Sequence, residues 1–228
     1  MALRRQVRAR RSGASTGTPA PAGPTKLYLQ NAAAGYTPTT IRGAWDDTAA
    51  MVTTALGSTK SGAVATVSRN ETNASATFDV GLLRFVSPAL TRAITLNGTI
   101  NWILGVSESN ADANMALHLH AYVTTGDTDT PRGTLITDLL ETAGNEWAAG
   151  GASTTGKVTE GGSVALTSVA AEVGDRIVIE YGAIARNTLT DPRNARASYG
   201  GTGNDLTDGG DATTLTGWIE FSQGLSFT

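Results

Sequence analysis

Two histidines in one short stretch are the residues of this chain best suited to acid–base or metal chemistry. His118 and His120 lie two positions apart in the run ALHLHAYVTT. Side chains two apart share one face of a strand, so the pair suits a metal ion if an acid supplies a third ligand. No acid is marked out as that ligand, and the alternative is an ordinary polar sheet face. We therefore predict no metal and no other cofactor.

Acidic residues gather in three places, and each suggests a chemistry that its spacing does not sustain. The runs at 127–129 (DTD) and 204–211 (NDLTDGGD) look like calcium loops, but neither has the EF-hand ligand positions or a closing glutamate. Asp46 and Asp47 beside Trp45 suggest a glycosidase cleft, yet adjacent strand residues diverge and cannot flank one bond. Turns and caps are the expected roles, with a loop calcium left open. With no cysteine nucleophile either, we expect no enzyme.

Two tryptophans, Trp45 and Trp147, lie beside predicted loops. Exposed indole rings on the loops of a β-sandwich are the platforms that a sugar-binding site uses. These two residues are therefore the candidates for glycan binding, with a host glycan as the partner. The alternative is that each ring is buried and pins its loop.

Alternating apolar residues predict that most of the chain forms short β-strands that position these groups. In the run 116–125 the leucines and Val123 point inward, and the histidines point the other way. We expect strands at 26–30, 63–67, 76–86, 92–106, 116–125, 133–140, 163–169, 176–185 and 218–221. Gly- and Asp-rich loops separate them at 124–132, 144–162 and 200–210.

Two stretches allow alternative interpretations. Residues 45–56 (WDDTAAMVTTAL) have helical character with an aspartate as cap, but a strand that carries Val52 and Leu56 fits nearly as well. Asn97-Gly98 between alternating runs predicts a β-hairpin, whereas a continuous bent strand is the alternative because only two or three strand residues precede the turn.

The pattern as a whole predicts an all-β fold, an antiparallel sandwich of about eight to ten strands with at most one helix. A chain of 228 residues fits one large β-domain. We place this domain at 26–228 and a flexible basic arm at 1–25. No apolar stretch approaches the roughly 20 residues that span a bilayer, and no apolar segment follows the basic start as a secretion signal requires.

The arm carries a concentrated positive charge and the domain a negative one. Residues 1–26 hold six of the 17 Lys and Arg and no acid, whereas 27–228 have a net charge of −9. The arm is expected to bind anionic surfaces, including a neighbouring copy of the domain. Contact of the arm with the phosphates of DNA, or no role at all, are the alternatives; the acidic domain is not expected to bind nucleic acid. The partner-binding residues proposed for the arm are Arg4, Arg5, Arg8, Arg10 and Arg11.

Several stretches resemble virion structural proteins of tailed phages and prophages. They are KLYLQNAAAGYTPTTIRGAWDD, SATFDVGLLRFVSPAL, GDTDTPRGTLITD, VGDRIVIEYGAIARNT and YGGTGNDLTDGGDATTLTGWIEFS, which together cover most of 26–222. The resemblance implies a jelly-roll-like sandwich that serves as capsid decoration, minor capsid protein or tail component. It also implies major capsid or tail proteins and further copies of the chain as partners, with synthesis in the cytoplasm of a host bacterium. A carbohydrate- or receptor-binding sandwich is the alternative function.

Overall fold

Strands make up nearly all regular structure in the computed structural model, which describes residues 21–47, 51–71, 77–150, 154–158, 162–188 and 191–228. In these ranges it has fourteen strands and two short 3-10 turns, so the predicted all-β class is confirmed. The strands are β1 (Thr25–Leu29), β2 (Val52–Gly57), β3 (Ala65–Glu71), β4 (Phe78–Val86), β5 (Ile94–Leu96), β6 (Thr99–Glu108), β7 (Met115–Thr124), β8 (Pro131–Leu140), β9 (Thr155–Val158), β10 (Val164–Ala165), β11 (Val169–Ala171), β12 (Arg176–Ala185), β13 (Arg193–Tyr199) and β14 (Trp218–Phe221). No helix in these ranges is long and apolar enough to cross a membrane.

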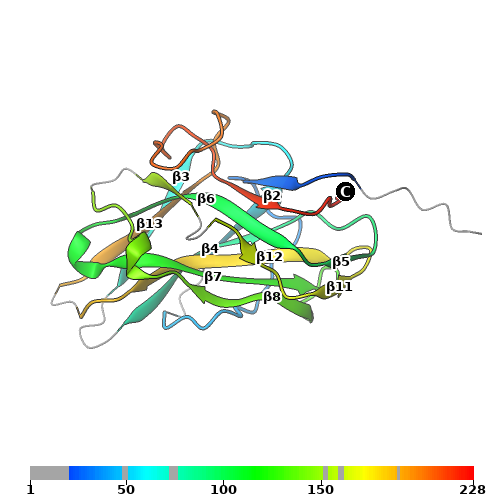
Figure 1. The fold of residues 1–228 in the computed structure, drawn as a ribbon, viewed down its shortest axis with the longest axis horizontal. Helices are drawn as coiled ribbons and strands as arrows, with labels where there is room; N and C mark the ends of the chain where they lie inside the picture. Colours follow the sequence, from blue (N-terminus) through cyan, green and yellow to red (C-terminus); the bar gives the residue numbers. More distant parts are fainter. Residues whose placement is uncertain (1–20, 48–50, 72–76, 151–153, 159–161, 189–190) are drawn as a thin grey trace, which may run out of the picture.

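The strands form one long hydrogen-bonded path that folds into two layers (Figure 1). The first layer runs β2-β4-β12-β7-β8, and the second runs β3-β13-β6-β14-β1, with β9 and β10 also paired to β6. Pairing of β1 with β2 joins the layers. All neighbours on this path are antiparallel except β2 and β4, which are parallel. A separate pair, β5 and β11, makes a small second sheet.

Apolar side chains from both layers pack into one core. Phe85 on β4 and Leu119 on β7 belong to the same buried cluster as Trp102 on β6 and Ile219 on β14. Alternation in β7 places Leu117, Leu119, Ala121 and Val123 in this cluster, as predicted from the sequence. Burial of these apolar faces supplies the main driving force for the sandwich.

The first layer is buried on both faces, because the segment 31–47 lies across its outer side. We call this segment the strap; it appears as the light-blue coil along the β7 and β8 side of the molecule in Figure 1. Every residue of β7 is buried, including His118, His120 and Tyr122 on the face turned away from the core. The polar face expected at His118 and His120 is therefore covered rather than exposed.

Several local predictions were wrong for identifiable reasons. Residues 51–56 are not helical: Val52–Gly57 is a strand, the alternative interpretation, and 48–50 lie outside the described residues. Asn97-Gly98 makes no hairpin, because β5 pairs with β11 while β6 pairs with other strands. Gly98, with φ of 83°, instead bends the chain as it passes from one sheet to the other.

Two strands lie where loops or nothing regular were expected. β13 has only small inward side chains, Ala195 and Ala197, which are fully buried but give little hydrophobic signal. β9 lies inside the predicted loop 144–162 and pairs with β6. These two strands, and the division of the predicted strands 92–106 and 163–169 into two each, raise the number of strands above the predicted eight to ten.

A glycine in β12 allows the two central strands of the first layer to approach each other. The β12–β4 register shifts between Tyr181 and Gly182, and a Cβ at Gly182 would lie 1.9 Å from the carbonyl oxygen of Val80. The atoms that this Cβ would meet belong to the backbone of β4, so no flexible side chain can move aside to make room for it.

We therefore predict that Gly182→Ala lowers the free energy of unfolding by about 1–3 kcal/mol or more, measured by chemical denaturation. Gly150→Ala is the matched control, because a Cβ there has nothing within 4 Å. Equal effects of the two substitutions would contradict this explanation.

Candidate functional site

Adjacent strands of the first layer bring together polar groups that are far apart in the sequence. Glu180 on β12 lies directly opposite Arg84 on β4 and His120 on β7 in the sheet register. His118 precedes His120 by one step on the same face, and Asp138 on β8 contacts both histidines. This group, which we call the strap cluster, lies between the outer face of the layer and the strap.

Glu180 is the fully buried centre of the strap cluster. Its Oε2 accepts hydrogen bonds from the backbone N–H groups of Arg42 at 3.0 Å and Gly43 at 2.9 Å. The indole N–H of Trp45 donates to the same oxygen at 3.3 Å. Arg84, itself 5% exposed, brings its guanidinium to 4.0 Å from Oε1. The strap thus supplies hydrogen-bond donors that replace the water molecules this carboxylate gives up on burial.

His118 lies between two aspartates beneath the strap. Its Nδ1 is 2.9 Å from Oδ1 of Asp79, and its Nε2 is 3.2 Å from Oδ1 of Asp138. Trp45 covers the imidazole, with the two ring centroids 4.0 Å apart and the planes 32° apart. Nδ1 of His120 reaches the same Asp138 oxygen at 3.1 Å.

Asp138 also holds the strap directly. Its Oδ1 accepts the backbone N–H of Ala44 at 3.0 Å, and its φ of 42° places it in the left-handed region that non-glycine residues rarely adopt. Burial would raise the pKa of Asp138, but the Ala44 N–H and the two histidines outweigh it, so the pKa lies below its usual range. The irregular β7–β8 register at this point turns the side chain under the strap.

The first expected calcium loop serves as a second anchor for the strap. Asp129 accepts hydrogen bonds from the Tyr36 hydroxyl at 2.9 Å and the Thr39 N–H at 2.8 Å, and also from the Thr39 hydroxyl. Chiefly through the Thr39 hydroxyl, the pKa of Asp129 falls to about 2. Asp127 pairs with Arg176 instead. These carboxylates hold protein groups in the present conformation.

The second expected calcium loop is also tied to protein donors. Asp205 pairs with Lys26 at 3.0 Å and Lys60 at 2.8 Å. Asp211 accepts the N–H of Thr213 at 2.9 Å, which is a turn role as expected for these acids. Within the described parts of the chain, no group of three or more His, Asp or Glu side chains is arranged to hold a metal ion.

Both candidate glycan-binding tryptophans are buried. Trp45 is 9% exposed under the strap, and Trp147 is 1% exposed. Neither offers the exposed ring face that the glycan hypothesis assumed, and the alternative of a buried ring that pins its loop describes both. Glycan binding by this chain stays a prediction without a contact to support it.

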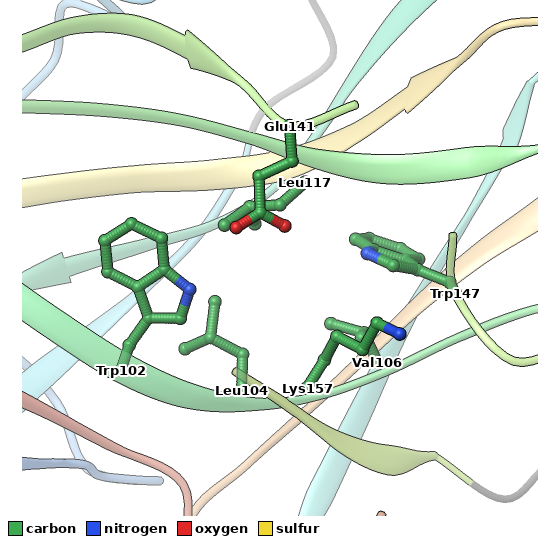
Figure 2. Close-up of a pocket in the computed structure, with 7 residues that line it drawn as sticks. All are labelled: Trp102, Leu104, Val106, Leu117, Glu141, Trp147 and Lys157. Carbon is green, nitrogen blue, oxygen red and sulfur yellow. The ribbon is translucent and has the colours of Figure 1, made fainter. Parts of the chain in front are cut away.

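Trp147 lines a small cavity of about 10 Å³ in the core, shown in Figure 2. The buried Glu141 carboxylate points into it from above, and Trp102 and Trp147 lie on opposite sides of it. The indole N–H of Trp147 has no hydrogen-bond partner among the described residues. The volume is below the roughly 300–1,000 Å³ of pockets that take drug-sized ligands, so this cavity does not hold a sugar in the present conformation.

The five arginines proposed as partner-binding residues, Arg4, Arg5, Arg8, Arg10 and Arg11, lie outside the described residues. The structure begins to describe the chain at Pro21, just before β1. The surface at the start of β1 is therefore what the structure contributes to the arm hypothesis.

A pair of carboxyl groups at the far end of β6 forms a second ionisable group that the sequence did not reveal. Glu108 is fully buried, and its Oε2 accepts the backbone N–H of Met115 at 2.8 Å. Burial, opposed by this hydrogen bond and reinforced by the neighbouring Glu146 carboxyl, raises the pKa of Glu108 to about 8. Glu108 therefore keeps its proton at neutral pH in the folded chain.

Comparison with known proteins gives likenesses of fold only. No family model and no curated protein matches the chain. Among solved structures it is similar to an α-amino acid ester hydrolase (TM-score 0.43, 10% identity, 89% of this chain and 36% of that one). It is also similar to an aminopeptidase from the marine sediment archaeon Thaumarchaeota archaeon (0.43, 11%, 87% and 37%). A third likeness is to the structure of infectious bursal disease virus, Gx strain (0.34, 12%, 72% and 36%).

The chain spans little more than a third of the length of each of these proteins. At these identities and TM-scores the likenesses concern overall shape alone. They name no activity for this chain.

Two of these proteins are hydrolases, and this finding contradicts the expectation that the chain is not an enzyme. That expectation rested on the spacing of acids along the sequence, which does not show the groups that strand pairing brings together. Strand pairing instead assembles Asp79, His118 and Asp138, together with Glu180, into one cluster. Residues from 20 to about 100 positions apart meet because β4, β12, β7 and β8 are neighbours in the sheet.

The strap cluster generates a stability prediction. Glu180→Gln removes the counter-charge of buried Arg84 and turns amide hydrogens toward the N–H donors of the strap. We expect the free energy of unfolding to fall by roughly 3–5 kcal/mol, the usual loss when one member of a buried ion pair is removed. Glu172→Gln is the control, since its side chain is 66% exposed beside Arg132; chemical denaturation should show a change within about 0.5 kcal/mol. Similar losses in both variants would refute the central role of Glu180.

Glu108 generates a prediction of pH dependence. A carboxyl group whose pKa is raised on folding binds a proton that the unfolded chain releases, so stability falls as pH rises from about 4.5 to about 8. Gln cannot ionise and keeps the acceptor for the Met115 N–H. Glu108→Gln should therefore match the wild type near pH 4.5 and exceed it by about 1–3 kcal/mol at pH 8. Melting curves from pH 4.5 to 8.5 measure this, and parallel curves for the two proteins would contradict it.

Proposed function

We propose that this chain is a structural component of a bacteriophage particle, a capsid decoration, minor capsid or tail protein. In this proposal the Arg-rich arm of one copy docks on the β-sandwich of a neighbouring copy or of another virion protein. The observation that carries the proposal is the opposite charge of the arm and the domain, together with a groove that carries the Glu220 carboxylate beside the point where the arm joins the domain. The resemblance of residues 26–222 to phage virion proteins supports the same role.

The groove is open, about 340 Å³ in volume, and lies beside the start of β1. Its lining carries hydrogen-bond acceptors and the carboxylate of Glu220, to which no cation is paired in the described parts of the chain. An arginine fork fits such a carboxylate with flanking hydroxyl and amide oxygens. The lining residues are Pro24, Thr99, Asn101, Ser163, Glu220 and Ser222.

Lys26, which is registered opposite Glu220, is already paired within the domain. Lys26 and Lys60 both pair with Asp205, and Lys26 also lies 4.1 Å from the centre of the Trp218 ring. The arm, by contrast, concentrates positive charge. Its first eleven residues carry five arginines, and the following Ser-, Gly- and Pro-rich residues supply reach.

A direct binding measurement tests arm docking. A labelled peptide of residues 1–20 is titrated with the chain that lacks those residues, and binding is followed by fluorescence anisotropy at two salt concentrations. We expect salt-sensitive binding that is lost when the five arginines of the peptide become alanine. Glu220→Gln should weaken it about two- to fivefold, the value of an exposed ion pair.

Two controls complete this test. Asp208→Asn changes the same charge on an exposed loop away from the groove and should leave the affinity unchanged. The shortened chain should keep the melting temperature of the full chain, since every described strand remains. Binding that is insensitive to the arginines or to Glu220 would refute docking in the groove. Absence of the protein from purified particles, by mass spectrometry, would refute the virion role itself.

A further inference from the structure

The turn Asn97-Gly98, which joins β5 to β6, carries two groups that can react with each other. Both residues are exposed. Within the parts of the chain that the structure describes, the side-chain amide of Asn97 has no hydrogen-bond partner, and neither has the backbone N–H of Gly98. The amide carbon of Asn97 and the backbone nitrogen that follows it are therefore not held by any other described group.

Hydrogen bonds hold the backbone on either side of these two groups. The backbone N–H of Asn97 donates to Oε1 of Gln223 at 2.7 Å. The carbonyl of Gly98 accepts the backbone N–H of Leu166 at 2.9 Å. These bonds fix the turn at the surface of the domain, yet neither of them uses the side-chain amide of Asn97 or the nitrogen of Gly98.

The fold requires a glycine after Asn97. Gly98 has a φ of 83°, which residues with a side chain rarely adopt, and a Cβ there would lie 2.6 Å from Oγ of Ser222. The same Oγ accepts the backbone N–H of Thr99 at 2.9 Å, so it has a role of its own in the turn. Of the asparagines in the sequence, Asn97 is the one that a glycine follows. The turn thus places next to this amide a backbone nitrogen that no side chain shields.

An asparagine in this setting can lose its side-chain nitrogen without an enzyme, because the two reacting atoms belong to neighbouring residues. The Gly98 nitrogen gives up its proton to a base in the solvent and attacks the amide carbon of Asn97. A new carbon–nitrogen bond then closes a cyclic imide, while the bond to the side-chain nitrogen breaks and that nitrogen leaves as ammonia. Water opens the imide at either carbonyl, which gives aspartate or isoaspartate.

We propose that Asn97 is a site of spontaneous deamidation, at which the folded chain converts an amide into a carboxylate. The new negative charge lies beside the groove that carries Glu220, since Thr99 and its hydrogen-bond partner Ser222 both line that groove. Isoaspartate also adds a methylene group to the backbone between β5 and β6. The modification itself does not depend on the proposed virion role.

The added charge has a consequence for arm docking, and this consequence alone rests on the proposed function. Asn97→Asp introduces the carboxylate directly, without isoaspartate. If arginines of the arm bind in the groove, this variant should bind the peptide of residues 1–20 about two- to fivefold more tightly at low salt, the value of an exposed ion pair. An unchanged affinity would count against docking in the groove and would leave the deamidation itself to the measurement that follows.

Mass spectrometry of the full chain tests the modification. The protein is incubated at 37 °C at pH 7.5 and pH 8.5, and its peptides are followed with time after digestion in acid. We expect the peptide that contains Asn97 to give aspartate and isoaspartate forms, faster at the higher pH because the attacking nitrogen must lose its proton. Asn187 is the internal control, since its exposed side-chain amide donates to the carbonyl of Asp112 at 2.8 Å and no glycine follows it. It should stay intact over the same time.

Two variants and one peptide show whether the turn itself controls the reaction. Gly98→Ala should slow the conversion at least about tenfold, which corresponds to about 1.4 kcal/mol in the barrier. Asn97→Gln is the matched control and should show no conversion, because its longer side chain disfavours closure of the ring. A synthetic peptide of residues 92–104, with and without the Gly98→Ala change, keeps the test decisive if that variant does not fold. An Asn97 that stays intact in the full chain while the peptide converts, or that converts no faster than Asn187, would overturn the proposal.

Discussion

The buried carboxylate of Glu180 is the requirement around which one side of this molecule is organised. A charge without water costs several kcal/mol unless donors replace the lost solvent. The sheet can offer Arg84 and the Tyr122 hydroxyl, and the rest must come from outside it. Residues 42–45 of the strap supply two backbone N–H groups and an indole N–H. That need fixes the strap, which in turn brings Trp45 over His118 and Ala44 to Asp138.

The charges of the domain therefore serve two different purposes. Those on the outer face of the first layer, such as Asp138 and Glu180, bind loops to strands and are hidden. Asp129 and Asp205 do the same at the edges, so acidic stretches that look like cation loops are occupied by protein donors. Glu220 differs, because it faces an open groove with no cation of its own among the described residues. Acids of this second kind are the ones available for contacts between molecules.

The sequence was a good guide to elements whose hydrophobic alternation is strong. β7 and β12 were expected almost at their observed bounds, because large apolar residues alternate there. β13 was missed because its buried residues are alanines, and the hairpin at Gly98 was wrong because pairing partners are chosen by the whole fold. Alternation also predicts which face a residue takes, but not what covers that face.

The strap cluster could not be predicted from alternation either, because it depends on which strands pair and on what covers their outer face. His118 was singled out, but its contacts Asp79 and Asp138 were not, since only the strand order β4-β12-β7-β8 brings them together. The strap was predicted only as a loop, because its contacts to carboxylates are made by backbone N–H groups, which every residue except proline has. Trp45 was noted as an aromatic residue near acids, although as an exposed platform rather than a buried lid.

The position of β1 has a mechanical consequence. This strand is inside the sheet, with Thr25–Tyr28 registered against β14 and Tyr28–Leu29 against β2. Tension applied through the N-terminus runs along the strand axis, so it loads these hydrogen bonds together in shear instead of opening them one at a time. The Lys26–Asp205–Lys60 ion pairs brace the same strand from the side. A tether that leaves the domain at this strand can transmit force to the whole sandwich before it detaches.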